Sequence, residues 1–486
     1  MATLHTLAFD NSYSRLPSGL YSRVEPAGFA HPHLVSFNPE AARLLDLEPE
    51  CAHNPDFVAF FGGQKLLPGS APLAMKYTGH QFGVYNPDLG DGRGLLLGEV
   101  VNAQGETWDL HLKGAGKTPY SRFGDGRAVL RSCIREYLGS EAMHHLGIPS
   151  TRALCIVGSD EPVLREKTER GAMLLRLADT HIRFGHFEWL FHSNQPELLK
   201  TLADFVITKH FPELADEHDR YTAFFREIVR RTARLMAFWQ LVGFAHGVMN
   251  TDNFSITGAT FDYGPFGFLD VYEPGFICNH SDYNGRYAWN QQPSVGLWNL
   301  NALAYALSGL IGKDALVAAL QGYESEFLGA YGTGLRQKLG LRTERPEDHQ
   351  LAADFLELLA RNNADYTRSF RALAHVGSAE GRSPLRDDFL DREAFDTWLR
   401  RYRERLRAEG SDDRERAAFM NSVNPKYILR NYMAQVAIDK AEDGDYGEIE
   451  KLRMLLTRPF DEQPENEAYA ALPPDWGRRL EISCSS

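Results

Sequence analysis

The pattern of apolar residues changes near residue 187, and this change limits the folds that a chain of 486 residues can adopt. Between residues 66 and 187, glycines separate short apolar runs, a pattern typical of β-strands joined by turns. The four clearest strand candidates are Gly94–Val100, Thr107–Lys113, Ala153–Ser159 and Ala172–Ala178. Beyond residue 187 apolar residues recur every three to four positions, which predicts helices. We therefore expect a strand-rich part followed by a helical part.

Helical periodicity also marks one helix inside the strand-rich part. The stretch Ala128–Gly147 places apolar residues four positions apart and ends in Gly-Ile-Pro, which predicts a buried helix with a sharp stop. Later stretches with a helical period are Tyr221–Phe244, 395–410 and 425–443.

Strands with one helix, followed by a helical region, are the element order of a bilobal, protein kinase-like α+β fold. The chain is also longer than a single hydrophobic core usually supports. We place an N-terminal extension at residues 1–65, a first lobe at 66–187, a second lobe at 188–350, and a helical C-terminal extension with a cysteine-bearing tail at 351–486.

Charge and composition exclude several classes of protein. Asp and Glu (65) outnumber Lys and Arg (52), for a formal charge of -13, so nonspecific binding to nucleic acid phosphates is not expected. The N-terminus has no basic start followed by an apolar run, and no apolar stretch is long enough to cross a membrane. The five cysteines show no CxxC spacing, which argues against a zinc site. We expect a soluble, cytoplasmic protein.

A lysine and a glutamate stand in the order that phosphate-transfer enzymes use. Lys113 ends the alternating run DLHLK, and Glu136 follows 23 positions later (136 minus 113) on the predicted helix. In kinases a strand lysine holds nucleotide phosphates and a helix glutamate orients it. Taken singly, each residue is better explained as a solvated surface charge. The pair in this order is more informative.

The segment HGVMNTDNF, from His246, has the form of a kinase catalytic segment without its usual base. Related small-molecule kinases have H-G-D, with an asparagine seven positions after the histidine. Asn253 keeps that offset, but Val248 stands at the aspartate position and cannot accept a proton. The nearest carboxylate is Asp252.

The stretch FSITGATFDYG then predicts a tight hairpin whose second strand delivers Asp262 in a D-Y-G triplet, comparable with the kinase D-F-G. Oxygens from Asn253 and Asp262 suit Mg²⁺. Asp270 is the rival metal ligand, but the hairpin would bring Asp262 directly back to Asn253. The alternative is that these are ordinary turn residues, since Asn, Asp and Gly favour turns.

Two glycine-rich stretches precede the predicted helix. The first, Asp88–Gly94, could bring backbone N–H groups and Arg93 to phosphates. The second, Gly114–Arg127, is not a Walker A loop, because a histidine stands where that motif needs glycine and a proline interrupts any helix starting there. We interpret it as a flexible loop that places Asp125 and Gly126 close to a nucleotide.

Two arginines lie in the run LLRLADTHIRFGHFE. Arg176 follows an apolar strand and Arg183 lies in an aromatic, His-rich loop. Inward-facing arginines at these places would need an anion. Salt bridges with Asp179 or Glu188 are the alternative, and the residues alone favour it.

Several long motifs carry a family resemblance. They are KYTGHQFG from Lys76, LGDGRG from Leu89, LHLKGAGKTPYSRFGDGRAVLRS from Leu110, HGVMNTDNFS from His246, FDYGPFGFLD from Phe261 and NPKYILRNY from Asn424. In this order, and over most of the chain, the sequence resembles the selenoprotein O family, protein adenylyltransferases with a pseudokinase fold.

The resemblance implies that ATP binds inverted relative to a kinase, with the γ-phosphate inside and the α-phosphate facing the protein substrate. The residues implied to bind the nucleotide are Gly90, Gly92, Arg93, Lys113, Asp125, Gly126, Arg176, Arg183 and Asp262. Glu136 would orient Lys113. Asn253 and Asp262 would hold Mg²⁺, with Mn²⁺ as an alternative ion. Asp252 would act as the base.

The implied reaction is transfer of AMP from ATP to Ser, Thr or Tyr hydroxyls of protein substrates, with release of pyrophosphate. A catalytically silent, ATP-binding pseudokinase scaffold is the second interpretation, and Val248 supports it. An ordinary kinase is the third. UMP transfer from UTP stays open, because nothing in the sequence identifies the base.

The resemblance also bears on two cysteines. Eukaryotic family members carry selenocysteine near the C-terminus, where this sequence has Cys484. Relatives suggest a disulfide from this tail to the loop after the D-Y-G segment, where Cys278 lies, and such a tether would make activity redox-sensitive. The alternative is an unpaired thiol, which a reducing cytoplasm favours.

Overall fold

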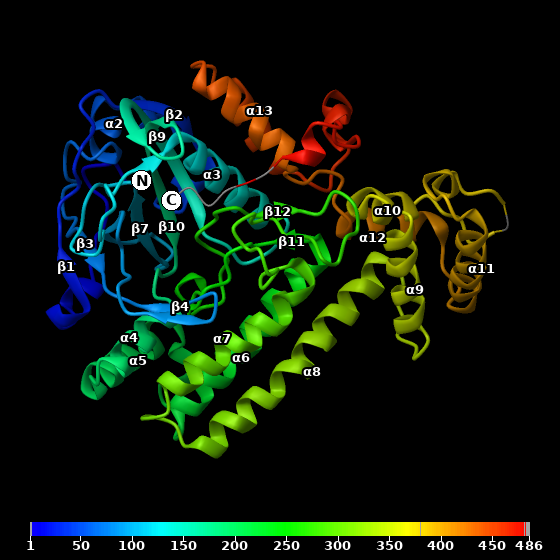
Figure 1. The fold of residues 1–486 in the computed structure, drawn as a ribbon, viewed down its shortest axis with the longest axis horizontal. Helices are drawn as coiled ribbons and strands as arrows, with labels where there is room; N and C mark the ends of the chain where they lie inside the picture. The colour runs from blue at the N-terminus through cyan, green and yellow to red at the C-terminus, as the bar shows by residue number, and fades with distance from the viewer. Residues whose placement is uncertain (1, 380, 481, 483–486) are drawn as a thin grey trace.

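The computed structural model describes residues 2–379, 381–480 and 482. Eight strands form one antiparallel sheet, and most of the helices follow it in the chain (Figure 1). In spatial order the sheet contains β1 (Tyr21–Arg23), β3 (Leu73–Met75), β6 (Gly94–Val101), β7 (Thr107–Lys113), β10 (Thr168–Ala178), β9 (Arg152–Leu164) and β2 (His33–Phe37), with β8 (Ala128–Val129) beside β10. Two short pairs lie outside it: β4 (Gly79–Gln81) with β5 (Val84–Asn86), and β11 (Phe244–Ala245) with β12 (Gly267–Phe268).

Helices pack against the sheet and are the main regular elements in the rest of the chain. They are α1 (Pro39–Arg43), α2 (Pro55–Phe61), α3 (Leu130–His145), α4 (Phe184–His192), α5 (Pro196–His210), α6 (Arg220–Val242), α7 (Gln292–Ala306), α8 (Lys313–Lys338), α9 (Asp348–Arg361), α10 (Tyr366–Leu373), α11 (Arg392–Ala408), α12 (Asp413–Val423), α13 (Asn431–Glu442) and α14 (Gly447–Leu456). Over the described ranges, none of them is long and apolar enough to cross a bilayer. The chain is thus a mixed α/β protein with a large antiparallel sheet, and the four predicted strands are confirmed.

Alternation of side chains along the strands gives the sheet its two faces. On β7, Leu110 and Leu112 are fully buried in the cluster that includes α1 and α2. His111 and Lys113 alternate with them and line a cavity on the other face. On β10, Arg176 lies opposite His111 in the ladder and lines the same cavity. The sheet therefore places polar residues of neighbouring strands side by side.

The predicted helix after these strands is α3, and its apolar stripe is buried as expected. Leu130, Ile134 and Leu138 are each 2% exposed or less. The helix begins two residues later than predicted, because β8 pairs with β10 immediately before it. It ends before Gly147, whose φ of 79° is favourable for glycine and closes the last turn. The predicted helix at 221–244 is likewise confirmed as α6.

The helix predicted over 425–443 is wrong at its start. Residues 425–430 are not helical, and α13 begins only at Asn431. Arg430 is 2% exposed and pairs with Asp270 at 2.5 Å and Asp365 at 2.7 Å. These buried ion pairs join segments far apart in the chain, so local periodicity did not reveal them.

Candidate active site

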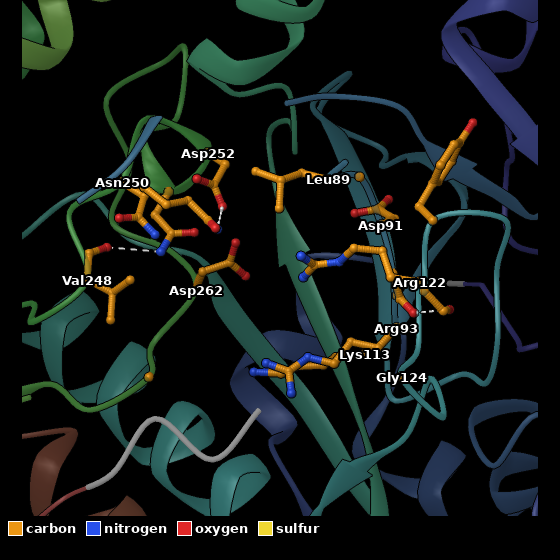
Figure 2. A pocket seen from close by; sticks show the side chains of 18 of the residues that line it. Leu89, Asp91, Arg93, Lys113, Arg122, Gly124, Val248, Asn250, Asp252 and Asp262 are labelled. Carbon is orange, nitrogen blue, oxygen red and sulfur yellow. Dashed lines mark hydrogen bonds between the residues drawn. The ribbon is translucent and has the colours of Figure 1, made fainter. Parts of the chain in front are cut away.

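A cavity of about 810 Å³ lies between the sheet and the segment that follows α6. Figure 2 shows Val248, Asn250, Asp252 and Asp262 on one side of it, with Arg93, Arg122 and Lys113 across from them. The residues predicted to bind the nucleotide all line it: Gly90, Gly92, Arg93, Lys113, Asp125, Gly126, Arg176, Arg183 and Asp262. Asp252 and Asn253 line it too.

Glu136, behind this lining, holds two of the cations. The carboxylate is fully buried, and one of its oxygens accepts a hydrogen bond from Lys113 Nζ. The other accepts from Arg176 Nη1 at 3.2 Å. The structure thus brings the predicted lysine and glutamate together as a buried pair. One carboxylate serves both cations because Lys113 and Arg176 lie on the same face of neighbouring strands.

Asp262 lies at the centre of the charged network. Its two carboxylate oxygens accept hydrogen bonds from Arg176 and Arg183. Burial alone would raise the pKa of this carboxyl, but the charges of Arg183, Arg176 and Lys113 hold the pKa well below 3.8. Its backbone has a φ of 58°, a left-handed conformation that Asp and Asn tolerate better than most residues. Asp262 is therefore an ionised carboxylate held in an uncommon conformation.

The salt bridges considered from the sequence for the two arginines do not form. In the described parts of the chain, Asp179 and Glu188 form no ion pair with either arginine, and Asp262 takes their place. Arg183 is 2% exposed and lies between the rings of Tyr77 and Phe261, 4.5 Å from each centroid. A buried guanidinium between aromatic faces is rigidly placed to meet an anion.

Asp252 differs from Asp262 because its carboxylate forms no ion pair with any described residue. Asp252 lies in a 3₁₀ helix of one turn, Thr251–Asn253, and is 8% exposed. Its Oδ1 is buried without a hydrogen-bond partner, and Gln81 Nε2 is 3.5 Å from Oδ2. Arg183 donates to the Asp252 carbonyl instead, at 2.8 Å. Burial raises the pKa of this carboxyl to about 7, although Arg183 partly opposes the shift. Such a group can accept a proton near neutral pH.

The predicted metal ligands have the right chemistry for a hard cation. Asn253 Nδ2 donates to the Val248 carbonyl at 2.9 Å, which leaves the amide oxygen for a ligand. Asp262 adds a carboxylate, and oxygen donors of this kind suit Mg²⁺. The rival ligand Asp270 pairs with Arg430 and does not line the cavity. A cation at Asp262 has to share or replace the arginine contacts.

Residues 254–262 do not form the predicted hairpin. Ser255 makes a bridge with Arg183, and Thr260 makes one with Ser150. The two arms of the turn therefore pair with different segments and not with each other. The sequence could not show this, because both pairings are long-range. The segment still delivers Asp262 to the cavity.

The two glycine-rich stretches pack against each other at the cavity edge. A Cβ on Gly90, whose φ is 130°, would lie 2.7 Å from the Tyr120 ring, so only glycine fits there. Asp125 is already engaged, because Arg165 donates to it at 2.8 Å. Arg93, by contrast, forms no ion pair with any residue that the structure describes. Arg122 also lines the cavity and forms no ion pair with a described residue, so Arg93 and Arg122 are both available for an added anion.

Sequence reasoning missed His111 and Asp91. The His111 ring lies 2.9 Å from Arg176 Nη2 through Nδ1 and 3.2 Å from Asp91 through Nε2. Burial and the charge of Arg176 lower the pKa of His111, so a neutral ring links the two groups. Alternation along DLHLK offered a signal, because His111 shares a face with Lys113.

A second group of metal-ligating side chains lies outside the cavity lining. Ligand atoms of His80, Glu188 and His192 all fall within 4.8 Å of one another. Glu188 and His80 already contact each other directly. These residues are distinct from the predicted Asn253 and Asp262 set.

Ile482, close to the C-terminus, contacts a residue near the predicted partner cysteine. Cys278 is 6% exposed, and burial raises the pKa of its thiol to about 12. Both the backbone N–H and the ring of His280 meet the Ile482 carbonyl, at 3.5 and 3.2 Å. Cys484 lies outside the described residues, so a disulfide with Cys278 stays a prediction.

Comparison with known proteins gives a consistent result. The family model described as protein adenylyltransferase SelO matches residues 3–457. A protein nucleotidyltransferase YdiU of Myxococcus xanthus (strain DK1622) is 59% identical over 488 residues, covering 100% of both chains. Proteins of the same name from Yersinia pseudotuberculosis serotype O:1b (strain IP 31758) and Aliivibrio salmonicida (strain LFI1238) are each 55% identical. The first match covers 98% of this chain and 99% of the relative, and the second covers 100% of both.

These matches extend over nearly the whole chain and include every segment that lines the cavity. The chain is therefore a nucleotidyltransferase and belongs to the protein adenylyltransferase SelO family.

Proposed function

We propose that this enzyme transfers AMP from ATP to Ser, Thr or Tyr hydroxyls of proteins, on a bilobal kinase-like fold that binds ATP with its γ-phosphate inward. The observation that carries the proposal is the separation of charge in the cavity. Lys113, Arg176 and Arg183 are buried around Asp262, whereas the Asp252 carboxylate forms no ion pair with a described residue. The highly charged terminal phosphate would bind at the cluster of cations around Asp262. The acceptor hydroxyl, which must lose its proton, would bind beside Asp252.

The reaction follows from this arrangement. The acceptor oxygen attacks the α-phosphorus as its proton passes to Asp252. The bond from the α-phosphorus to the bridging oxygen breaks, and the electron pair leaves with pyrophosphate. Lys113, Arg176 and Arg183 neutralise the leaving group, so they act in the transition state as well as in binding. Mg²⁺ bound by Asn253 and Asp262, or Mn²⁺ in its place, would supply further positive charge there.

Two alternatives make different use of the same cavity. The relatives are named only as nucleotidyltransferases, so UMP transfer from UTP is the closest alternative. We favour AMP because the matching family model is that of an adenylyltransferase. A silent ATP-binding scaffold is supported by Val248, but Asp252 supplies a carboxylate in the same cavity.

A labelling experiment separates these functions. The protein is incubated with Mg²⁺, a generic acceptor protein, and ATP labelled at either the α- or the γ-phosphate. UTP labelled at the α-phosphate is run in parallel. We expect label on the acceptor only from α-labelled ATP. Label only from the γ position indicates a kinase, stronger transfer from UTP indicates UMP transfer, and no label from any nucleotide indicates a scaffold. Asp262→Ala serves as the inactive control.

A further inference from the structure

A second hollow of about 610 Å³ adjoins the catalytic cavity and shares Phe82 with it. Ser281 lines the catalytic cavity, and the next residue in the chain, Asp282, lines the second hollow. Helix α7 also lines this hollow, through residues that include Trp298. We call this hollow the side groove. A chain whose hydroxyl entered the cavity would have the side groove next to it.

Phe82 stands between the two hollows in a conformation that phenylalanine disfavours. Phe82 and Gly83 form the two-residue turn from β4 to β5, with φ values of 50° and 83°. Positive φ at both positions is typical of a type I′ turn, for which Asn-Gly is the favoured pair. The phenylalanine ring is nevertheless 43% exposed. A strained backbone that presents an exposed aromatic ring beside an active site indicates that the ring has a function.

The turn is fixed to the catalytic segment. The Phe82 N–H donates to the Tyr287 hydroxyl at 2.9 Å and lies 3.3 Å from Asn250 Oδ1. The Tyr287 hydroxyl in turn donates to Asn250 at 2.6 Å. Because Asn250 is two residues before Asp252, the exposed ring is held at a set position relative to the proposed base.

Arg286 contributes a positive charge to the lining of the side groove. It forms no ion pair with the described residues, and its Nε is buried without a hydrogen-bond partner. Its guanidinium lies 4.8 Å from the centroid of the Trp298 ring. The neighbouring Asp282 is directed elsewhere, because its oxygens accept the backbone N–H groups of Arg286 and Tyr287 at 3.0 and 2.7 Å. The guanidinium is therefore available to a carboxylate from outside.

We propose that the side groove binds the segment of the protein substrate next to the modified hydroxyl. It selects segments with a carboxylate for Arg286 and an apolar side chain against Phe82 and Trp298. The inference rests on the proposed transfer to protein hydroxyls and adds an acceptor preference to it. The overall charge of -13 gives no general attraction to acidic proteins, so the preference comes from Arg286 itself.

Charge exchange tests this inference. The acceptors are synthetic peptides with one serine, one leucine and a single variable position that is Glu, Gln or Lys, placed in turn at each position near the serine. Transfer from α-labelled ATP is measured as kcat/KM. The parent enzyme should favour Glu over Gln by about tenfold at one or more positions. Arg286→Glu should reverse the order, so that Lys peptides become the better acceptors. Arg234→Glu, at an exposed arginine outside both hollows, should keep the parent preference.

The ratio of kcat/KM for two peptides, measured on one enzyme preparation, does not depend on the fraction of enzyme that is folded. A variant that folds poorly therefore still gives an answer. Phe82→Asn supplies a second test, because Asn-Gly suits the turn while the ring is lost. It should raise KM for the peptides about tenfold and leave KM for ATP within about twofold.

Equal rates with Glu, Gln and Lys peptides, or an unchanged preference in Arg286→Glu, overturn the side-groove inference. A change in oligomeric state in Arg286→Glu without a change in preference also overturns it, because the groove is then a contact between copies of the chain. If no labelled nucleotide modifies any peptide or protein, the proposed function itself fails.

Discussion

The Asp252→Asn protein is expected to transfer AMP about 10² to 10⁴ times more slowly than the parent protein, and yet to be more stable above neutral pH. The loss of rate follows because an amide cannot accept the proton of the attacking hydroxyl, and a positioned general base contributes about this factor. Val248 cannot replace the lost base. Single-turnover transfer from α-labelled ATP measures the rate.

The gain in stability follows from the raised pKa of Asp252. Burial raises it from 3.8 to about 7, so the folded protein binds this proton more tightly than the unfolded chain does. Stability from this group is therefore complete below pH 3.8 and is lost as the pH rises through about 7. At higher pH the buried charge costs about 4 kcal/mol, a cost that Asn never incurs. Urea unfolding of the metal-free proteins at several pH values measures the difference. A stability difference that does not change with pH, or transfer at the parent rate, contradicts this account of Asp252.

Asp262→Asn should have the opposite effect on stability and at least as large an effect on transfer. Asn tolerates the left-handed backbone at this position, so the variant tests the charge and not the conformation. We expect transfer to fall by about a thousandfold or more, because the carboxylate that would hold Mg²⁺ is lost. We also expect the free energy of unfolding to fall by about 3 kcal/mol, since Arg183 is left buried without a counter-charge.

The affinity for ATP in the absence of metal should rise in Asp262→Asn, although the transfer rate falls. In the parent protein Arg176 and Arg183 are occupied by Asp262, so a phosphate group must compete for them. In Asp262→Asn this competing carboxylate is lost, although Arg176 keeps its contact with Glu136. ATP in the presence of EDTA should therefore bind about tenfold more tightly. Titration calorimetry measures the affinity. Asp270→Asn is the matched control, because it also breaks a buried ion pair, with Arg430, but outside the cavity. Weaker metal-free binding in Asp262→Asn contradicts the assigned role of the arginines.

Local patterns in the sequence were sufficient for the regular elements. Alternation along DLHLK placed Lys113 on the polar face of β7, and a four-residue spacing placed the buried stripe of α3. The order of these two elements was enough to suggest the pair of Lys113 with Glu136, which the structure shows as a buried contact. Each of these predictions depends on residues close together in the chain.

Features that depend on long-range contacts could not be predicted in the same way. Ser255 pairs with Arg183 and Thr260 with Ser150, so the expected hairpin does not form. The start of α13 is displaced because Arg430 pairs with distant carboxylates. For the same reason the sequence suggested local partners for Arg176 and Arg183, whereas their common partner is Asp262.

The orientation of the bound triphosphate is the central claim, and a crystal structure tests it most directly. The complex should contain Mg²⁺ and an ATP analogue with a non-cleavable link between the α- and β-phosphorus atoms. We predict the terminal phosphate at Arg176 and Arg183, and the α-phosphorus beside Asp252 at the cavity mouth. An α-phosphate seated between the arginines, with the terminal phosphate directed toward solvent, would contradict the account.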